Sequence, residues 1–220
     1  NSKAKYIYLD SDVLIRHDIS ELWEECKNII NTSRNDGAGV FATQDYGYPN
    51  GHQTLEASRN LFRKKGFFVE EKQIYHNAGV FFIDWPLVKQ NIRVQFISQI
   101  DDIIDIAEEL DEHNKKRVTF ADQDILNLFF KIRSLEKTWN VQGIGCYMKD
   151  RCSYQHEWFP KLFSNDEYTR LVNNPYIVHF TGPDRVSAYI NMPGKPWNPM
   201  CQNPFKHEFL KYQKRTPFKE

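Results

Sequence analysis

The sequence has few cysteines, no long apolar run and no excess of charge, and each absence excludes a class of protein. Its 4 cysteines form no Cys-x-x-Cys pair, which argues against a structural zinc site. No stretch approaches the roughly twenty apolar residues that span a bilayer. The apolar segment at 7–15 is interrupted by acids, unlike a secretion signal. The 29 basic residues balance the 29 acidic ones, which argues against nucleic acid as a partner.

The cysteines leave two interpretations open. Cys146 and Cys152 are close enough in sequence to form a disulfide across a short loop. Alternatively, all four cysteines are reduced thiols of a cytosolic protein, the others being Cys26 and Cys201. We favour the second interpretation.

Apolar periodicity predicts an α/β protein. A chain of 220 residues suits one domain with a substantial core. Runs of β-branched and aromatic residues predict strands at 5–9, 39–43, 79–83 and 176–180. Helices are predicted from Asp18, from Asp84, around 100–110, over 122–131 and in the tail from Pro204, and a loop with one short helix over 46–66. Alternating strands and helices favour a single domain with a mostly parallel, buried sheet.

Two carboxylates follow the first predicted strand, in Asp10-Ser11-Asp12. Ligands bind at this end of strands in open α/β sheets, and carboxylates suit Mg²⁺ or Mn²⁺, which bridge them to phosphates. A polar turn is the alternative without chemistry. A phosphotransferase with an aspartyl nucleophile is another, but Leu14 stands where it needs Thr or Val. The only Asp-Asp pair, at 101–102, lies in a predicted helix.

Three further motifs carry polar side chains next to strands or helices. Asn77 and Ala78 precede the third predicted strand, where a small residue lets the backbone approach a ligand. Asp122-Gln123-Asp124 opens a predicted helix, so Asp122 is either the N-cap or part of a polar rim suited to a hexose. His179, at the end of the last predicted strand, is a possible metal ligand. Gly182 and Lys195 follow it, as a backbone contact and a charge for a phosphate. Each motif alone also has a purely structural explanation.

Together and in this order, the four motifs resemble glycosyltransferase family 8, whose members are retaining enzymes and include bacterial lipopolysaccharide galactosyl- and glucosyltransferases. The matching segments run from Tyr8 to about Pro204, which we take as the catalytic domain, with 205–220 as a basic aromatic tail. The resemblance implies a Rossmann-like nucleotide-sugar transferase fold. It also implies a cytoplasmic enzyme that moves glucose or galactose from a UDP-sugar to a glycan or lipid-linked oligosaccharide.

The resemblance also implies roles for individual residues. Asp10, Asp12 and His179 would be the protein ligands of Mn²⁺. Gly182 and Lys195 would contact the diphosphate, together with Ser11 in the Asp-x-Asp turn. Asp45, Asn77, Ala78, Asp122 and Gln123 would bind the donor, with Gln123 beneath the anomeric carbon and Asp122 beside it as the residues nearest the chemistry.

The chain departs from the family in three places. Ala121 stands where some relatives place a polar residue, so contacts to the acceptor or sugar would differ. The family's first strands and helices, which form the uridine pocket, would precede residue 1, and residues 184–194 look like an insertion before Lys195. A non-catalytic carbohydrate-binding or interaction module derived from such an enzyme therefore remains an alternative. The tail is either a packed helix or a segment resting on the inner membrane surface, because it mixes basic and aromatic residues.

Overall fold

The computed structural model describes residues 4–32, 36–50, 55–71, 74–113, 121–146, 148, 164–182 and 193–216. The chain forms two compact units. Unit 1 comprises residues 1–8 and 23–135, and unit 2 comprises residues 9–22 and 136–220. The chain therefore passes from one unit to the other three times.

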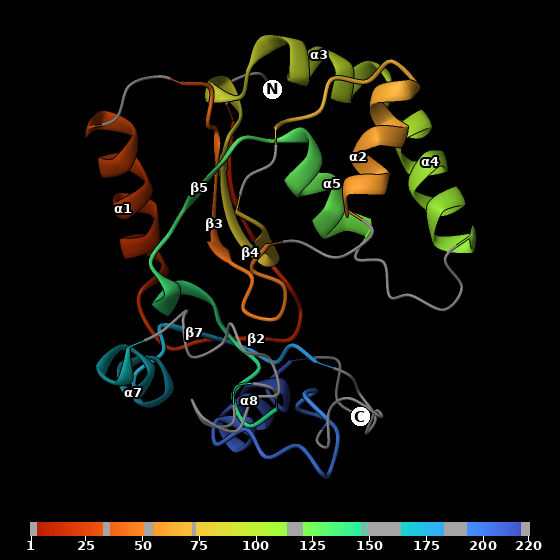
Figure 1. Cartoon of the computed structure of the whole chain (residues 1–220). Coiled ribbons are helices and arrows are strands. Elements are labelled where there is room, and N and C mark those ends of the chain that lie inside the picture. The colour runs from red at the N-terminus through yellow and green to blue at the C-terminus, as the bar shows by residue number, and fades with distance from the viewer. Residues whose placement is uncertain are drawn as a thin grey trace. The chain divides into compact units, whose positions relative to one another are not determined.

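Unit 1 is built on a four-stranded sheet in the order β1-β4-β3-β5 (Figure 1). Its strands are β1 (Lys5–Leu9), β3 (Val40–Gln44), β4 (His76–Asp84) and β5 (Ile132–Ser134). The strands predicted at 5–9, 39–43 and 79–83 are thus confirmed, although β4 begins three residues earlier. The prediction of a mostly parallel sheet is wrong, because β3 pairs antiparallel with β4 and parallel only with β5.

Helices cover both faces of this sheet. The helix α1 (Ile19–Thr32) lies against one face, where Trp23 packs edge-to-face on Phe82 of β4 (Figure 1). The other face carries the main core, in which buried residues of β3 and β4 meet those of the remaining helices. These are α2 (Leu55–Lys64), α3 (Gln90–Ser98), α4 (Ile100–His113) and α5 (Ala121–Phe129). A sheet covered on both faces explains why β4 has no polar residue from Ala78 to Ile83.

Two predicted helix caps in unit 1 differ from the structure. Asp84 is followed by only a short 3₁₀ turn (Trp85–Leu87) and makes no side-chain cap; its carboxylate instead lies 2.7 Å from the ammonium of Lys5. Because α5 already begins at Ala121, Asp122 lies inside the first helical turn rather than at the N-cap. Asp84 therefore forms an ion pair with Lys5 and caps no helix through its side chain. Asp122 is not an N-cap because α5 begins one residue before it.

Unit 2 contains a three-stranded sheet in the order β2-β7-β6. The strands are β2 (Val13–Ile15), β6 (Val141–Gln142) and β7 (Ile177–His179), and the helices are α7 (Asn165–Asn173) and α8 (Lys206–Gln213), with a 3₁₀ turn at Lys137–Asn140. Strand β7 pairs antiparallel with β2 and parallel with β6. This sheet is also mixed, so here too the mostly parallel prediction is wrong.

The tail helix α8 is packed within unit 2. Phe209 lies edge-to-face on Phe180, with ring centroids 5.1 Å apart, and the guanidinium of Arg16 lies 4.3 Å above the ring of Phe205. These contacts fit the packed-helix interpretation of the tail, and its membrane role stays a prediction. Across the described ranges, no helix has the length and apolar character to cross a bilayer.

Two sequence-based questions concern residues beyond those described. Cys152 lies outside the described residues, and so does the short-loop disulfide considered for it. Residues 183–192, most of the predicted insertion, also lie outside them. Cys26 is buried, and burial raises the pKa of its thiol to about 12, so it is an unreactive core residue.

Candidate metal and donor site

Two carboxylates and an imidazole converge in unit 2. Asp10 and Asp12 lie in the turn between β1 and β2, and His179 is the last residue of β7. The His179 Nε2 atom lies 3.5 Å from Asp10 Oδ2 and 3.4 Å from Asp12 Oδ1. One ligand atom from each residue falls within 4.8 Å of the other two. We call these three residues the Asp-Asp-His cluster, which the sequence predicted as the metal ligands.

Strand pairing brings the cluster together from distant parts of the chain. In the antiparallel ladder of β2 and β7, Val13 is the register partner of His179. The next backbone hydrogen bond runs from Phe180 N to the carbonyl of Asp12, at 3.0 Å. Asp12 therefore lies directly before the ladder, next to His179. Asp10, two residues earlier in the turn, also reaches the imidazole of His179.

The cluster has the composition and spacing that a divalent metal requires. Two carboxylates and a neutral imidazole are ligands that Mn²⁺ accepts. Ligand atoms at right angles around one ion stand about 3 Å apart, because each metal bond is about 2.1 Å long. The observed separations from His179 Nε2 of 3.4 and 3.5 Å are close to this value. The residues present thus fit a divalent ion.

The electrostatics of the cluster favour an ionised Asp12 carboxylate. Burial alone would raise the pKa of Asp12, but hydrogen bonds to His179 and Lys195 and their positive charges lower it to about 2. Burial alone would lower the pKa of His179, but the hydrogen bonds and charges of Asp12 and Asp10 raise it above its ordinary value. Protons and a metal ion therefore compete for the same imidazole nitrogen.

Lys195 joins the cluster through Asp12. Its ammonium nitrogen lies 2.5 Å from Asp12 Oδ2. Gly194, the preceding residue, packs so closely on the chain at 181–182 that an added Cβ would lie 2.1 Å from the Thr181 carbonyl oxygen. The structure thus places Lys195 beside the cluster, and its contact to a diphosphate stays a prediction. Ser11 is exposed in the turn that separates the two carboxylates.

Gly182 is required by its backbone conformation and by its neighbours, which gives a first testable prediction. It has a φ of +114°, and a Cβ there would meet Cys146 Sγ at 2.8 Å. We expect Gly182→Ala to lower the free energy of unfolding by about 2–4 kcal/mol and to weaken donor binding, because Gly194, which packs on residue 182, must shift together with Lys195. Urea denaturation and donor titration measure both effects.

Gly66 supplies the matched control for this substitution. It has a similar positive φ of +88°, but a Cβ there would meet nothing within 4 Å. Gly66→Ala should cost only about 1–2 kcal/mol for the backbone conformation and leave donor binding unchanged. Equal effects of the two substitutions would contradict the steric argument for Gly182.

A second cluster of predicted residues lies in unit 1. Asp45, Asn77, Ala78 and Gln123 are all buried, and we call them the amide network. The Gln123 Oε1 atom accepts from Asn77 Nδ2 at 3.1 Å and from the Ala78 backbone at 3.0 Å. Asp45 Oδ2 accepts from Gln123 Nε2 at 3.0 Å and from Asn77 Nδ2 at 3.1 Å. These bonds fix the orientation of the Gln123 carboxamide.

The antiparallel pairing of β3 and β4 explains why the amide network forms. Asp45 directly follows the end of β3, and Asn77 and Ala78 lie at the start of β4, so all three stand at one edge of the sheet. Asn127 joins α5 to that edge: it accepts from the backbone N of His76 at 2.8 Å and donates to its carbonyl at 2.7 Å. This clamp brings the N-terminal turn of α5, and with it Gln123, to the strand ends.

Asp122 is attached to the network without being buried in it. Its side chain is exposed, and its Oδ1 accepts from the backbone N of Gln123 at 2.8 Å. Of the two predicted donor-binding residues in α5, Asp122 is therefore exposed to solvent and Gln123 is buried.

The sequence did not predict a role for Tyr75, which is fully buried and donates a hydrogen bond to Asp124. Burial and the charge of Asp124 raise the pKa of this phenol far above its ordinary value, so it stays a donor. Burial, reinforced by the charge of Asp122 and opposed by the Tyr75 hydrogen bond, raises the pKa of Asp124 to about 6. The residues next to Tyr75 in the sequence do not indicate this contact, because Asp124 lies 49 positions further along the chain.

The Asp124 carboxyl predicts a pH dependence of stability. An aspartate in an unfolded chain titrates near 3.9, and in the folded protein Asp124 titrates at about 6, so folding favours its protonated form. This stabilisation is fully present below about pH 4 and is lost as the pH rises through 6, by about 3 kcal/mol. Urea unfolding between these values measures it. Asp124→Asn should lack this component, and an unchanged pH dependence in that variant would contradict it.

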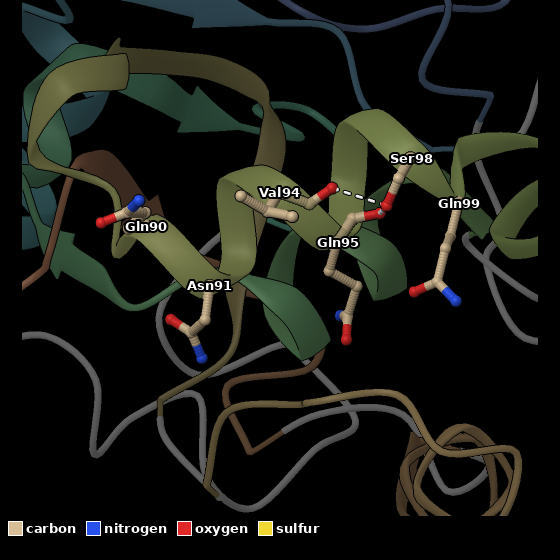
Figure 2. A pocket seen from close by; sticks show the side chains of 6 residues that line it. All are labelled: Gln90, Asn91, Val94, Gln95, Ser98 and Gln99. Carbon is tan, nitrogen blue, oxygen red and sulfur yellow. Dashed lines mark hydrogen bonds between the residues drawn. The ribbon is translucent and has the colours of Figure 1, made fainter.

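A groove along α3 is separate from both clusters. It has a volume of about 780 Å³ and is lined by Gln90, Asn91, Val94, Gln95, Ser98 and Gln99 (Figure 2). Two of its polar groups are already engaged: Gln95 bonds the backbone of Phe68 at 2.7 and 2.9 Å, and Ser98 donates to the carbonyl of Val94 at 2.8 Å. With no carboxylate or imidazole among its six lining residues, the groove offers no metal chemistry.

Comparison with curated proteins gives distant bacterial relatives. General stress protein A of Bacillus subtilis (strain 168) is 28% identical over 220 residues, which cover 98% of this chain and 60% of that protein. Lipopolysaccharide 1,3-galactosyltransferase of Salmonella typhimurium (strain LT2) is 26% identical over 223 residues, which cover 97% of this chain and 50% of that protein. The chain thus spans about half to three-fifths of these relatives.

Solved structures show a similar fold. The crystal structure of the galactosyltransferase LgtC in complex with donor and acceptor sugar analogs gives a TM-score of 0.53 at 21% identity, covering 98% of this chain and 63% of that one. The glycosyltransferase GlyE of Streptococcus pneumoniae TIGR4 gives a TM-score of 0.51 at 21% identity, covering 96% of this chain and 40% of that one. Residues 1–201 match the family described as Glycosyl transferase family 8. The chain belongs to glycosyl transferase family 8.

Proposed function

We propose that this protein is a metal-dependent hexosyltransferase that moves glucose or galactose from a UDP-sugar to a glycan or lipid-linked oligosaccharide. The observation that carries the proposal is the Asp-Asp-His cluster. In a member of family 8, it brings the turn at 10–12 together with His179. A polar turn alone would not need a buried imidazole held against both carboxylates.

We assign the diphosphate of the donor to the Asp-Asp-His cluster and to Lys195. A divalent ion, when bound, supplies Lewis-acid stabilisation of the departing nucleotide. The residues themselves hold the Asp12 carboxylate ionised, as its depressed pKa indicates. Lys195 adds a positive charge at the same carboxylate. Gly182 remains the proposed backbone contact to the phosphate.

We assign the hexose to the amide network and Asp122. A sugar ring offers hydroxyls that both donate and accept, which suits a buried carboxylate flanked by carboxamides. The network is rigid because its members hold one another, and rigid polar groups lose little entropy when they bind. Gln123 is neutral, so it can stand close to the developing positive charge of the sugar without a change of protonation.

Retention of the anomeric configuration is part of the proposal and rests on the family. Two carboxylates acting as acid and nucleophile, as in retaining glycosidases, are not assigned here. Positioning of the acceptor and stabilisation of the leaving group would supply most of the rate. Galactose is the first hexose to test, because two of the similar proteins are named as galactosyltransferases.

The test of the proposal is a donor assay with the protein. UDP-galactose and UDP-glucose are incubated with Mn²⁺, with and without a panel of galactosides and glucosides. We expect slow hydrolysis without an acceptor, faster transfer with a suitable one, and loss of both when EDTA removes the metal. NMR of the product should show the donor's anomeric configuration. Metal-dependent binding of UDP-sugar without any turnover would favour the alternative of a non-catalytic carbohydrate-binding module.

A further inference from the structure

The imidazole of His179 has a second contact, on the nitrogen that faces away from the carboxylates. Its Nδ1 atom lies 3.0 Å from Oδ1 of Asn140, and both side chains are buried. The two residues lie 39 positions apart, and the motifs of the family resemblance do not include Asn140.

This contact determines which ring nitrogen carries the proton. The Asn140 oxygen is an acceptor, so Nδ1 must be the donor. In a neutral imidazole the other nitrogen then carries the lone pair. That nitrogen is Nε2, which faces Asp10 and Asp12 at 3.5 and 3.4 Å. Asn140 thus selects the tautomer that presents a lone pair to the cluster.

Backbone hydrogen bonds on both sides of Asn140 anchor its segment of the chain beside β7. Tyr176 N donates to the carbonyl of Thr138 at 3.0 Å, and Gly143 N donates to the carbonyl of His179 at 3.0 Å. Between these bonds, β6 runs parallel to β7, and Gln142 is the register partner of His179. The backbone of Asn140, directly before β6, is therefore held next to β7 by the sheet.

We propose that Asn140 is a positioning residue for the metal site: by accepting from Nδ1 of His179 it fixes the ring and its tautomer, so that Nε2 is ready to bind a divalent cation. The inference rests on the proposed metal-dependent function and extends it to a residue that touches neither metal nor donor. Outer partners of this kind commonly contribute 10- to 100-fold to metal affinity, because they remove the freedom of the ligand ring.

The test measures binding of Mn²⁺ alone, by calorimetry, to the unaltered protein and two variants. Asn140→Leu keeps the volume and removes the acceptor, and we expect it to weaken Mn²⁺ binding by about 10- to 100-fold. Thr138→Val is the matched control: Thr138 is equally buried in the same 3₁₀ turn, and its hydroxyl bonds Glu136 at 3.3 Å. This variant should bind Mn²⁺ as the unaltered protein does.

Nitrogen-15 NMR of the unaltered, Mg²⁺-loaded protein provides a readout that does not depend on the folding of a variant. We expect the proton of the His179 ring on Nδ1. A proton on Nε2, or equal Mn²⁺ affinities of the unaltered protein and Asn140→Leu, would overturn the inference while leaving the proposed function intact. If the unaltered protein binds neither Mn²⁺ nor Mg²⁺, the proposed function fails and the inference with it.

Discussion

Replacing Asp12 by alanine is expected to lower Mn²⁺-dependent turnover of a UDP-hexose by about 10³-fold or more, because a metal contributes several kcal/mol to stabilising the leaving group. Asp12 is 5% exposed and faces both His179 and Lys195. Its loss removes a ligand and the counter-charge of the lysine. Steady-state hydrolysis and transfer assays over a range of Mn²⁺ concentrations measure the effect.

Asp166→Ala is the control for this substitution. Asp166 also lies in unit 2, but it is exposed in the first turn of α7. It should leave turnover within about twofold of the unaltered protein, since exposed charges contribute little. Turnover of Asp12→Ala at the unaltered rate, with metal dependence retained, would rule out the Asp-Asp-His cluster as the metal site.

Gln123→Leu is expected to lower the free energy of unfolding by about 2–4 kcal/mol and to abolish transfer. The leucine fills a similar volume, but it leaves the buried N–H of Ala78 without its acceptor and takes a donor from Asp45. Each buried polar group without a partner costs about 1–3 kcal/mol. Urea denaturation gives the stability change, and donor hydrolysis gives the catalytic one.

Ile125→Val is the control that distinguishes the effect of losing the Gln123 hydrogen bonds from the effect of altered packing of α5. Ile125 lies two residues further along the helix and packs against the apolar core. This substitution should cost about 0.5–1.5 kcal/mol and leave transfer unchanged. If Gln123→Leu is no more destabilising than this control, the hydrogen bonds of Gln123 are not what holds the strand ends and α5 together.

The sequence was sufficient for the long elements and insufficient for strand direction. Strands β1, β3 and β4, and helices α1 and α4, carry long apolar patterns and lie where they were predicted. The short strands β2, β5 and β6 have two or three residues each and no pattern of their own. A strand buried on both faces looks alike in parallel and antiparallel sheets, which is why β4 was assigned the wrong direction.

The candidate site divides in the same way. Residue types and order were enough to select Asp10, Asp12 and His179, which the structure brings together. Asn140 and Tyr75 could not be selected, because each acts through one contact with a residue far along the chain. A single Asn before a two-residue strand has many equivalents in any sequence. The catalytic assignment of Gln123 stays a prediction, and what the structure adds is its fixed orientation.

The threefold passage of the chain between the units has a consequence for biosynthesis. All residues of unit 1 have been made once Leu135 has left the ribosome, whereas the Asp-Asp-His cluster needs both the turn at 10–12 and His179. Chains fold progressively from the N-terminus during synthesis. Asp10 and Asp12 therefore lack the third ligand of the cluster until the chain has been made as far as His179. A nascent chain arrested before β7 would hold a formed amide network and no competent metal site.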